Sequence, residues 1–193
     1  IPLVDNLLSR VSEIVIGGGM AYTFLAAQGG KVGKSLLDEN MIEDCERLLQ
    51  KARELDVVVH LPKDHVVAES IDDETAHEVT GDIPNGQAAF DIGPKTALEF
   101  SAAIGRAKTI LFNGPMGVFE RTRFSNGTQV IVRAIAEATE AGAFSVVGGG
   151  DSASAAEHYG VDDKMSHVST GGGASLTLLQ GAPMPAFEAL IQK

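Results

Sequence analysis

The chain has 193 residues, a formal net charge of −11 and 44% hydrophobic residues, so it is long enough to bury a substantial core. The acidic balance excludes the basic face that a long nucleic acid requires, and no apolar run approaches the ~18 residues of a membrane span, so we expect neither partner. The single cysteine, Cys45, excludes an internal disulfide and is typical of a reducing compartment, and its helical surroundings favour a structural thiol over a reactive one.

The first half of the chain alternates helical and extended patterns. In chain order, the elements are a helix over 3–10, a strand over 13–18, helices over 19–27 and 38–54, and strands over 57–62 and 65–69. The helix over 38–54 carries apolar residues at helical spacing and acids in its first turn, as the helix dipole favours. Residues 70–87 are polar and rich in turn residues, and we expect them to form an excursion.

The second half continues the alternation. The order is a strand over 88–93, a helix over 94–107, a strand over 109–114, a helix over 127–142, a strand over 144–149, a helix over 151–160, a strand over 165–169 and a helix over 172–181. Pro94 stands at a predicted helix start, and Gly142 at a predicted helix end.

This alternation predicts an α/β fold, a Rossmann-like three-layer domain over 1–193 in which helices flank a mostly parallel sheet. Right-handed crossovers place the carboxyl ends of such strands on one edge, where ligands of these sheets bind. Glycine clusters at 17, 93, 114, 148 and 171 all follow predicted strands. We therefore expect these glycines to gather around one site.

Three glycines follow a predicted strand in each of "IVIGGGMAYT" (14–23), "SVVGGGDSAS" (145–154) and "HVSTGGGASL" (167–176). Glycine there either permits a tight turn with positive φ or lets the backbone approach an anion with helix N–H groups. Three such turns, together with "NGPMG" (113–117), favour a phosphate or nucleotide site.

Two familiar phosphate motifs fit poorly. "GGKVGKS" (29–35) has three residues between its glycines where a P-loop needs four, and it follows a helix, so Lys34 is interpreted as an exposed loop lysine. "GGGDSA" (148–153) fits a dinucleotide-binding fingerprint, but the acid expected about 20 residues later is missing. This weakens a dehydrogenase hypothesis without removing it.

Two acids are candidates for ligand contacts. Asp151 begins a predicted helix, where it could be an N-cap or a magnesium ligand, and the converging glycines favour the metal. Ser152 beside it could donate to a phosphate oxygen. Glu120 could accept hydrogen bonds from ribose hydroxyls, although residue type alone favours a solvated loop acid. The histidines show no metal-ligand spacing and are interpreted as structural or exposed.

The segments "NGPMGVFE" (113–120), "GGGDSASA" (148–155) and "SHVSTGGGASL" (166–176) resemble the C-terminal, nucleotide-binding half of phosphoglycerate kinases. "VIGGGMAYTFL" (15–25) and "DIGPKT" (91–96) agree, and the resemblance covers essentially the whole chain in order. It implies Mg²⁺-dependent phosphoryl transfer between 1,3-bisphosphoglycerate and ADP, giving 3-phosphoglycerate and ATP. It also implies a cytoplasmic glycolytic monomer.

The resemblance implies a role for each site residue. The adenine pocket would comprise Gly17, Gly18, Leu36, Gly93, Gly117 and Val118. Glu120 would bind the ribose, with Asn113 and Pro115 near the nucleotide. Asp151 would ligate magnesium, and Gly149, Gly150 and Ser152 would meet the phosphates. Backbone N–H groups of Gly150 and Gly173 would serve catalysis.

The resemblance also implies that the substrate-binding half and an upstream lysine-bearing segment lie outside this chain, which begins at Ile1 rather than Met. We therefore expect a piece of a two-domain kinase that binds nucleotide without turning over. Two alternatives stay open. One is a Rossmann-type domain that binds NAD, and the other is a non-catalytic nucleotide sensor that would tolerate Asp151→Asn.

Overall fold

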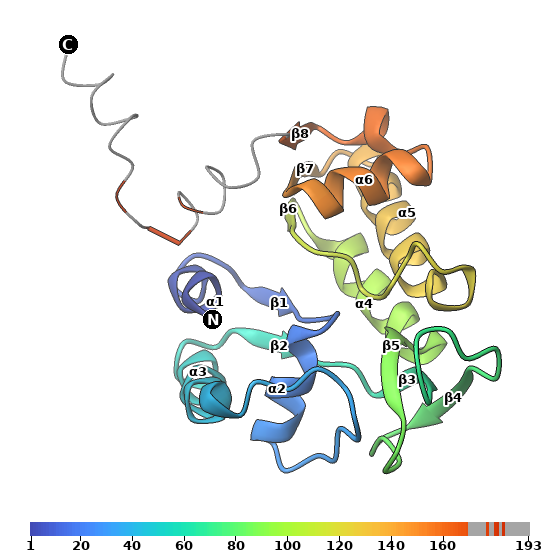
Figure 1. Cartoon of the computed structure of the whole chain (residues 1–193). Helices are drawn as coiled ribbons and strands as arrows, with labels where there is room; N and C mark the ends of the chain where they lie inside the picture. The colour runs from blue at the N-terminus through green and yellow to red at the C-terminus, as the bar shows by residue number, and fades with distance from the viewer. Residues whose placement is uncertain (170–176, 178–179, 182, 184–193) are drawn as a thin grey trace.

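The computed structural model describes residues 1–169, 177, 180–181 and 183 (Figure 1). The α-helices are α1 (Pro2–Leu7), α2 (Met20–Ala27), α3 (Ile42–Glu54), α4 (Pro94–Arg106), α5 (Asn126–Glu140) and α6 (Gly150–His158). The strands are β1 (Glu13–Val15), β2 (Val58–His60), β3 (Asp64–Ala68), β4 (His77–Thr80), β5 (Ala88–Ile92), β6 (Thr109–Phe112), β7 (Phe144–Gly148) and β8 (His167–Ser169). Short 3-10 helices are η1 (Glu39–Met41), η2 (Thr122–Phe124) and η3 (Asp162–Lys164).

The predicted fold class is confirmed, because helices flank mostly parallel sheets. β1 pairs with β2 in parallel, and β6, β7 and β8 form a second parallel sheet in that order. In Figure 1, α2 and α3 lie beside β1 and β2, whereas α5 and α6 lie beside β6 and β7. The helix expected over 172–181 lies outside the described residues except for its positions 177, 180 and 181.

The expectation that all strand ends share one edge is wrong for the middle of the chain. β3 pairs antiparallel with both β4 and β5, which form a sheet of their own in the order β4-β3-β5. The connections 69–76 and 81–87 hold no crossover helix, and parallel neighbours in one sheet need one. The predicted excursion over 70–87 accordingly contains strand β4.

Apolar clusters hold these layers together. The largest joins α4 and α5 to the inner face of β6 and β7, with Phe100, Ile135 and Val147 almost fully buried. A second joins α2 and α3 to the first parallel pair and contains Cys45. Burial raises the pKa of the Cys45 thiol, which disfavours the reactive thiolate. Among the described residues, no helix has the length and apolar character needed to cross a bilayer.

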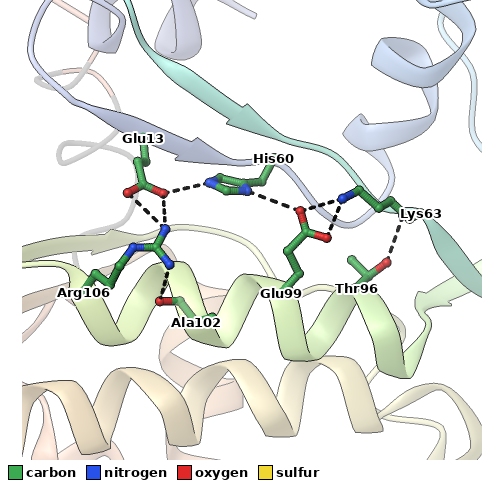
Figure 2. A network of polar contacts seen from close by, with 7 residues as sticks. All are labelled: Glu13, His60, Lys63, Thr96, Glu99, Ala102 and Arg106. Atoms are coloured by element: carbon green, nitrogen blue, oxygen red, sulfur yellow. Dashed lines mark hydrogen bonds and ion pairs between the residues drawn. The ribbon is translucent and has the colours of Figure 1, made fainter.

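A polar network ties the first parallel pair to α4 (Figure 2). Glu13 on β1 binds His60 Nε2 of β2 at 2.8 Å and Arg106 Nη2 of α4 at 3.1 Å. Glu99 of α4 binds Lys63 Nζ at 2.7 Å and lies 3.8 Å from His60 Nδ1. The hydrogen bond from His60 lowers the pKa of Glu13, and the one from Lys63 lowers the pKa of Glu99. This network connects β1 and β2 to α4.

Candidate functional site

Residues 113–120, which we name the β6 loop, contact the first turn of α6. Gly114, at φ +97°, donates its N–H to the buried Ser152 Oγ at 2.6 Å. A Cβ added to Gly149 would lie 2.8 Å from Asn113 Oδ1. The segments "NGPMGVFE" and "GGGDSASA" therefore meet in space, and the positive φ of Gly114 and Gly149 favours glycine at both positions.

The turn after β1 reaches the same loop from the other side. Gly18, at φ +62°, donates its N–H to the carbonyl of Met116 at 3.2 Å. Cβ atoms would lie 2.3 Å from Met116 Sδ at Gly17 and 2.7 Å from the Pro115 carbonyl oxygen at Gly18. Side chains at these positions would push the two segments apart, so the glycines serve a close backbone approach.

The β6 loop also rests on α5 and β5. The buried Thr128 Oγ1 accepts the N–H groups of Met116 at 3.0 Å and Gly117 at 3.2 Å. Val118 donates its N–H to the carbonyl of Phe90 at 2.9 Å. With these bonds made, the backbone of the loop is fixed without help from a ligand.

A buried carboxylate lies under the loop. Asp91 of β5 is 0% exposed, and its oxygens accept N–H groups from Ile92 at 2.9 Å and Gly127 at 2.7 Å. Desolvation raises the pKa of Asp91 to about 7, although both hydrogen bonds act in the opposite direction.

An apolar groove of about 340 Å³ opens beside the first glycine triplet. Its lining residues are Ile1, Gly19, Met20, Thr23, Leu36, Leu37, Asp38 and Met41. Leu36 is 76% exposed there, and a Cβ on Gly19 would lie 2.9 Å from Leu36 Cδ1. A flat apolar ring could cover this side chain, as expected for a nucleobase pocket.

Gly93 lies apart from the place where the glycine-rich segments meet. The atoms nearest to a Cβ built on it belong to the Asp64 side chain, with Cγ at 2.3 Å. Asp64 accepts the N–H groups of Lys95 at 2.9 Å and Thr96 at 2.7 Å, and so caps α4 from β3. In this structure Gly93 makes room for that cap.

Of the polar candidates around α6, Asp151 and Glu120 face solvent, whereas Ser152 is buried against the β6 loop. Gly150 and Asp151 are exposed in its first turn, whose N-terminal N–H groups have no partner within the helix, and Glu120 is exposed at the end of the β6 loop. Among the residues that the structure describes, no three histidine, cysteine, aspartate or glutamate side chains gather to hold a metal. A lone exposed carboxylate fits Mg²⁺, which takes one or two protein carboxylates beside phosphates and water. Gly173 lies outside the described residues.

α6 contacts the β6 loop at both of its ends. Ser152 binds Gly114 at the first turn, and the His158 ring packs against Phe119 with ring centroids 5.9 Å apart at the last turn. Tyr159 follows and donates its hydroxyl to the carbonyl of Ser125 at 3.0 Å. One helix thus contacts the β6 loop near both its start, at Gly114, and its end, at Phe119.

Sequence reasoning missed the residues that support the loop from below. Thr128 gives no signal, because a threonine in a helical pattern is ordinary. Asp91 does give one: it is the charged residue in the otherwise apolar run "AAFDIG". An acid inside a buried strand needs partners, and here they are backbone N–H groups.

Comparisons with known proteins agree with one another. The family model described as phosphoglycerate kinase matches residues 1–182. A probable phosphoglycerate kinase of Caenorhabditis elegans is 50% identical over 194 residues, which cover 98% of this chain and 46% of the relative. A protein named "Phosphoglycerate kinase, cytosolic" from Trypanosoma congolense is 47% identical over 196 residues, 100% of this chain and 47% of the relative.

Solved structures give the same result. A phosphoglycerate kinase structure from Coxiella burnetii superposes with a TM-score of 0.93 at 40% identity, covering 99% of this chain and 48% of that one. The chain therefore spans about half the length of the proteins that it matches.

Proposed function

The chain belongs to the phosphoglycerate kinase family, and we propose that residues 1–193 form its nucleotide-binding, C-terminal domain, which binds ADP or ATP with Mg²⁺. The complete enzyme would transfer a phosphoryl group between 1,3-bisphosphoglycerate and ADP, giving 3-phosphoglycerate and ATP. Family membership disfavours the NAD-binding alternative. The name of the Trypanosoma congolense relative supports a cytoplasmic location.

One observation carries this proposal: three glycine-rich segments that are far apart in sequence touch through the β6 loop. Gly18 binds Met116, and Ser152 binds Gly114. Beside this meeting point, Gly150 leaves open space at the exposed first turn of α6, whose N-terminal N–H groups have no partner within the helix. A nucleotide needs such an arrangement, with an apolar groove for its base and helix N–H groups for its phosphates.

The individual contacts are proposed from the resemblance, and among the residues proposed for the base Leu36 is the one that lines the groove. The base would lie by Gly17, Gly18, Leu36, Gly117 and Val118, with Gly93 proposed from the resemblance alone. The ribose hydroxyls would bind Glu120, with Asn113 and Pro115 nearby. The phosphates would meet Gly149, Gly150 and Ser152 at the first turn of α6.

Asp151 would hold Mg²⁺, which neutralises phosphate charge when bound. Its place in the first turn of α6 puts one carboxylate beside the proposed phosphate position. Phosphoryl transfer requires positioning and charge neutralisation more than a covalent catalyst, so the backbone N–H groups of Gly150 and Gly173 would contact the transferred group. We further propose that this chain alone binds nucleotide without turnover, because domain closure assembles such sites.

Calorimetric titration of the chain with ADP, with and without Mg²⁺, tests the proposal. We expect Mg²⁺ to tighten binding, and Asp151→Asn to remove most of that gain, about tenfold or 1.4 kcal/mol. Asp163→Asn on η3 is the matched control, since it removes an equal charge from another exposed position. Absence of binding under every condition, or equal Mg²⁺ effects in both variants, would overturn the proposal.

A further inference from the structure

The Asp91 carboxyl lies where two glycines leave room for it. A Cβ would lie 2.3 Å from Asp91 Oδ1 at Gly117 and 2.2 Å from the same atom at Gly127. Gly117 belongs to the β6 loop, and Gly127 to the first turn of α5. The carboxyl therefore supports both backbones by direct packing, and its contact with the loop lies at the residue before Val118.

The surroundings of Asp91 contain hydrogen-bond donors without a balancing cation. Its charge acts on the phenols of Tyr22 in α2 and Tyr159 after α6, raising the pKa of both in addition to the effect of burial. Its direct donors are the backbone N–H groups of Ile92 and Gly127. No Lys, Arg or His side chain pairs with it among the contacts of the described residues. Since burial penalises an unpaired charge, this carboxyl gains a proton near neutral pH.

We propose that Asp91 is a positioning residue of the nucleotide site, and that nucleotide binding is coupled to proton uptake at its carboxyl. The inference rests on the proposed function, because it requires that the β6 loop contacts the nucleotide. The carboxyl does not touch the ligand in this proposal. It acts through Gly117, against which it packs.

The sign of the coupling follows from charge. The charge of the nucleotide lies in its phosphates, which we propose at the first turn of α6, and Ser152 of that turn is bonded to the same loop that Asp91 supports. Negative charge added at this site disfavours the ionised Asp91 carboxyl, so binding favours protonated Asp91. The proton comes from solvent, and affinity falls as pH rises through about 7. If binding raises the pKa by about one unit, the affinity falls about fivefold between pH 6 and pH 8.

The test measures Mg²⁺-ADP binding by calorimetry from pH 6 to 8 in buffers of different ionisation enthalpy, which reports proton uptake. Asp91→Asn keeps the shape but cannot titrate, so it should lose this uptake and flatten the profile. Titration of the ligand itself is common to both proteins and cancels in the comparison. Asp163→Asn is the charge-matched control and should behave as wild type.

The outcomes separate the two proposals. Wild-type binding with the same pH profile and proton uptake in Asp91→Asn would overturn the coupling and leave the nucleotide site standing. A wild-type chain that binds no nucleotide overturns the proposed function, and the coupling fails with it. If Asp91→Asn does not fold, the test is the titration of the wild-type Asp91 carboxyl, followed by its ¹³C shift against pH with and without Mg²⁺-ADP. A midpoint raised by Mg²⁺-ADP supports the coupling, and an unchanged midpoint refutes it.

Discussion

Gly127→Ala tests the packing of the buried carboxylate without touching a proposed ligand contact. Gly127 is in the first turn of α5, and its φ is compatible with alanine. By helix propensity alone the substitution would stabilise the fold by about 0.5–1 kcal/mol. The new Cβ, however, would lie 2.2 Å from Asp91 Oδ1 and 2.5 Å from Ile92 Cγ1.

The clash decides whether Gly127→Ala stabilises or destabilises the fold. Both neighbours are buried side chains, so they cannot swing into solvent. Overpacking costs about 1–3 kcal/mol, and displacing the carboxylate also weakens the 2.7 Å hydrogen bond from Gly127, for about 1 kcal/mol more. After subtracting the helix gain, we expect a net loss of about 2 kcal/mol, or about 4–8 °C in Tm for a chain of this size.

Chemical unfolding followed by circular dichroism measures this loss, with Gly105→Ala as the matched control. Gly105 is also helical, in α4, but its Cβ would meet nothing within 4 Å, so alanine there should stabilise by about 0.5 kcal/mol. In an Asp91→Ala background the penalty of Gly127→Ala should shrink, because the contact with the carboxyl is gone and only the one with Ile92 Cγ1 remains. An equal penalty in both backgrounds would refute the reasoning.

Two further predictions concern Ser152 and His65. Ser152→Ala removes the acceptor of the Gly114 N–H at a fully buried position, so it should lower the free energy of unfolding by about 1–3 kcal/mol, whereas an unchanged Tm would show that water replaces the hydroxyl. Burial lowers the pKa of His65, so the unfolded chain binds protons more readily as pH falls below about 6.5, and stability should decrease from pH 7 to pH 5. Urea midpoints at both pH values should differ less in His65→Gln than in wild type, and equal differences would contradict the assignment.

The sequence predicts the helices and buried strands well where one face is apolar. α3 is an example, because Cys45, Leu48 and Ala52 recur at helical spacing and are buried as expected. β4 is missed because three of its four residues are exposed, so it has no alternating apolar pattern. The direction of β3 and β5 is missed as well, since parallel and antiparallel strands share the same side-chain period.

The candidate site was likewise predictable from the sequence only in part. Glycine triplets after strands signal a close backbone approach, and the structure does join Gly18 and Gly149 to the β6 loop. Which groups hold that loop from below could not be read from the pattern. Thr128 and Asp91 act through contacts between segments distant in sequence, and a single acid or hydroxyl in a run does not reveal its partner.

The bond between Gly114 and Ser152 joins residues 38 positions apart, with α5 and β7 between them. Contacts this distant in sequence form after local ones during folding, because closing the intervening loop costs entropy. The shape of the β6 loop thus depends on the docking of α5 and α6. A substitution far from the loop that weakens this docking can abolish the site while every proposed binding residue remains unchanged.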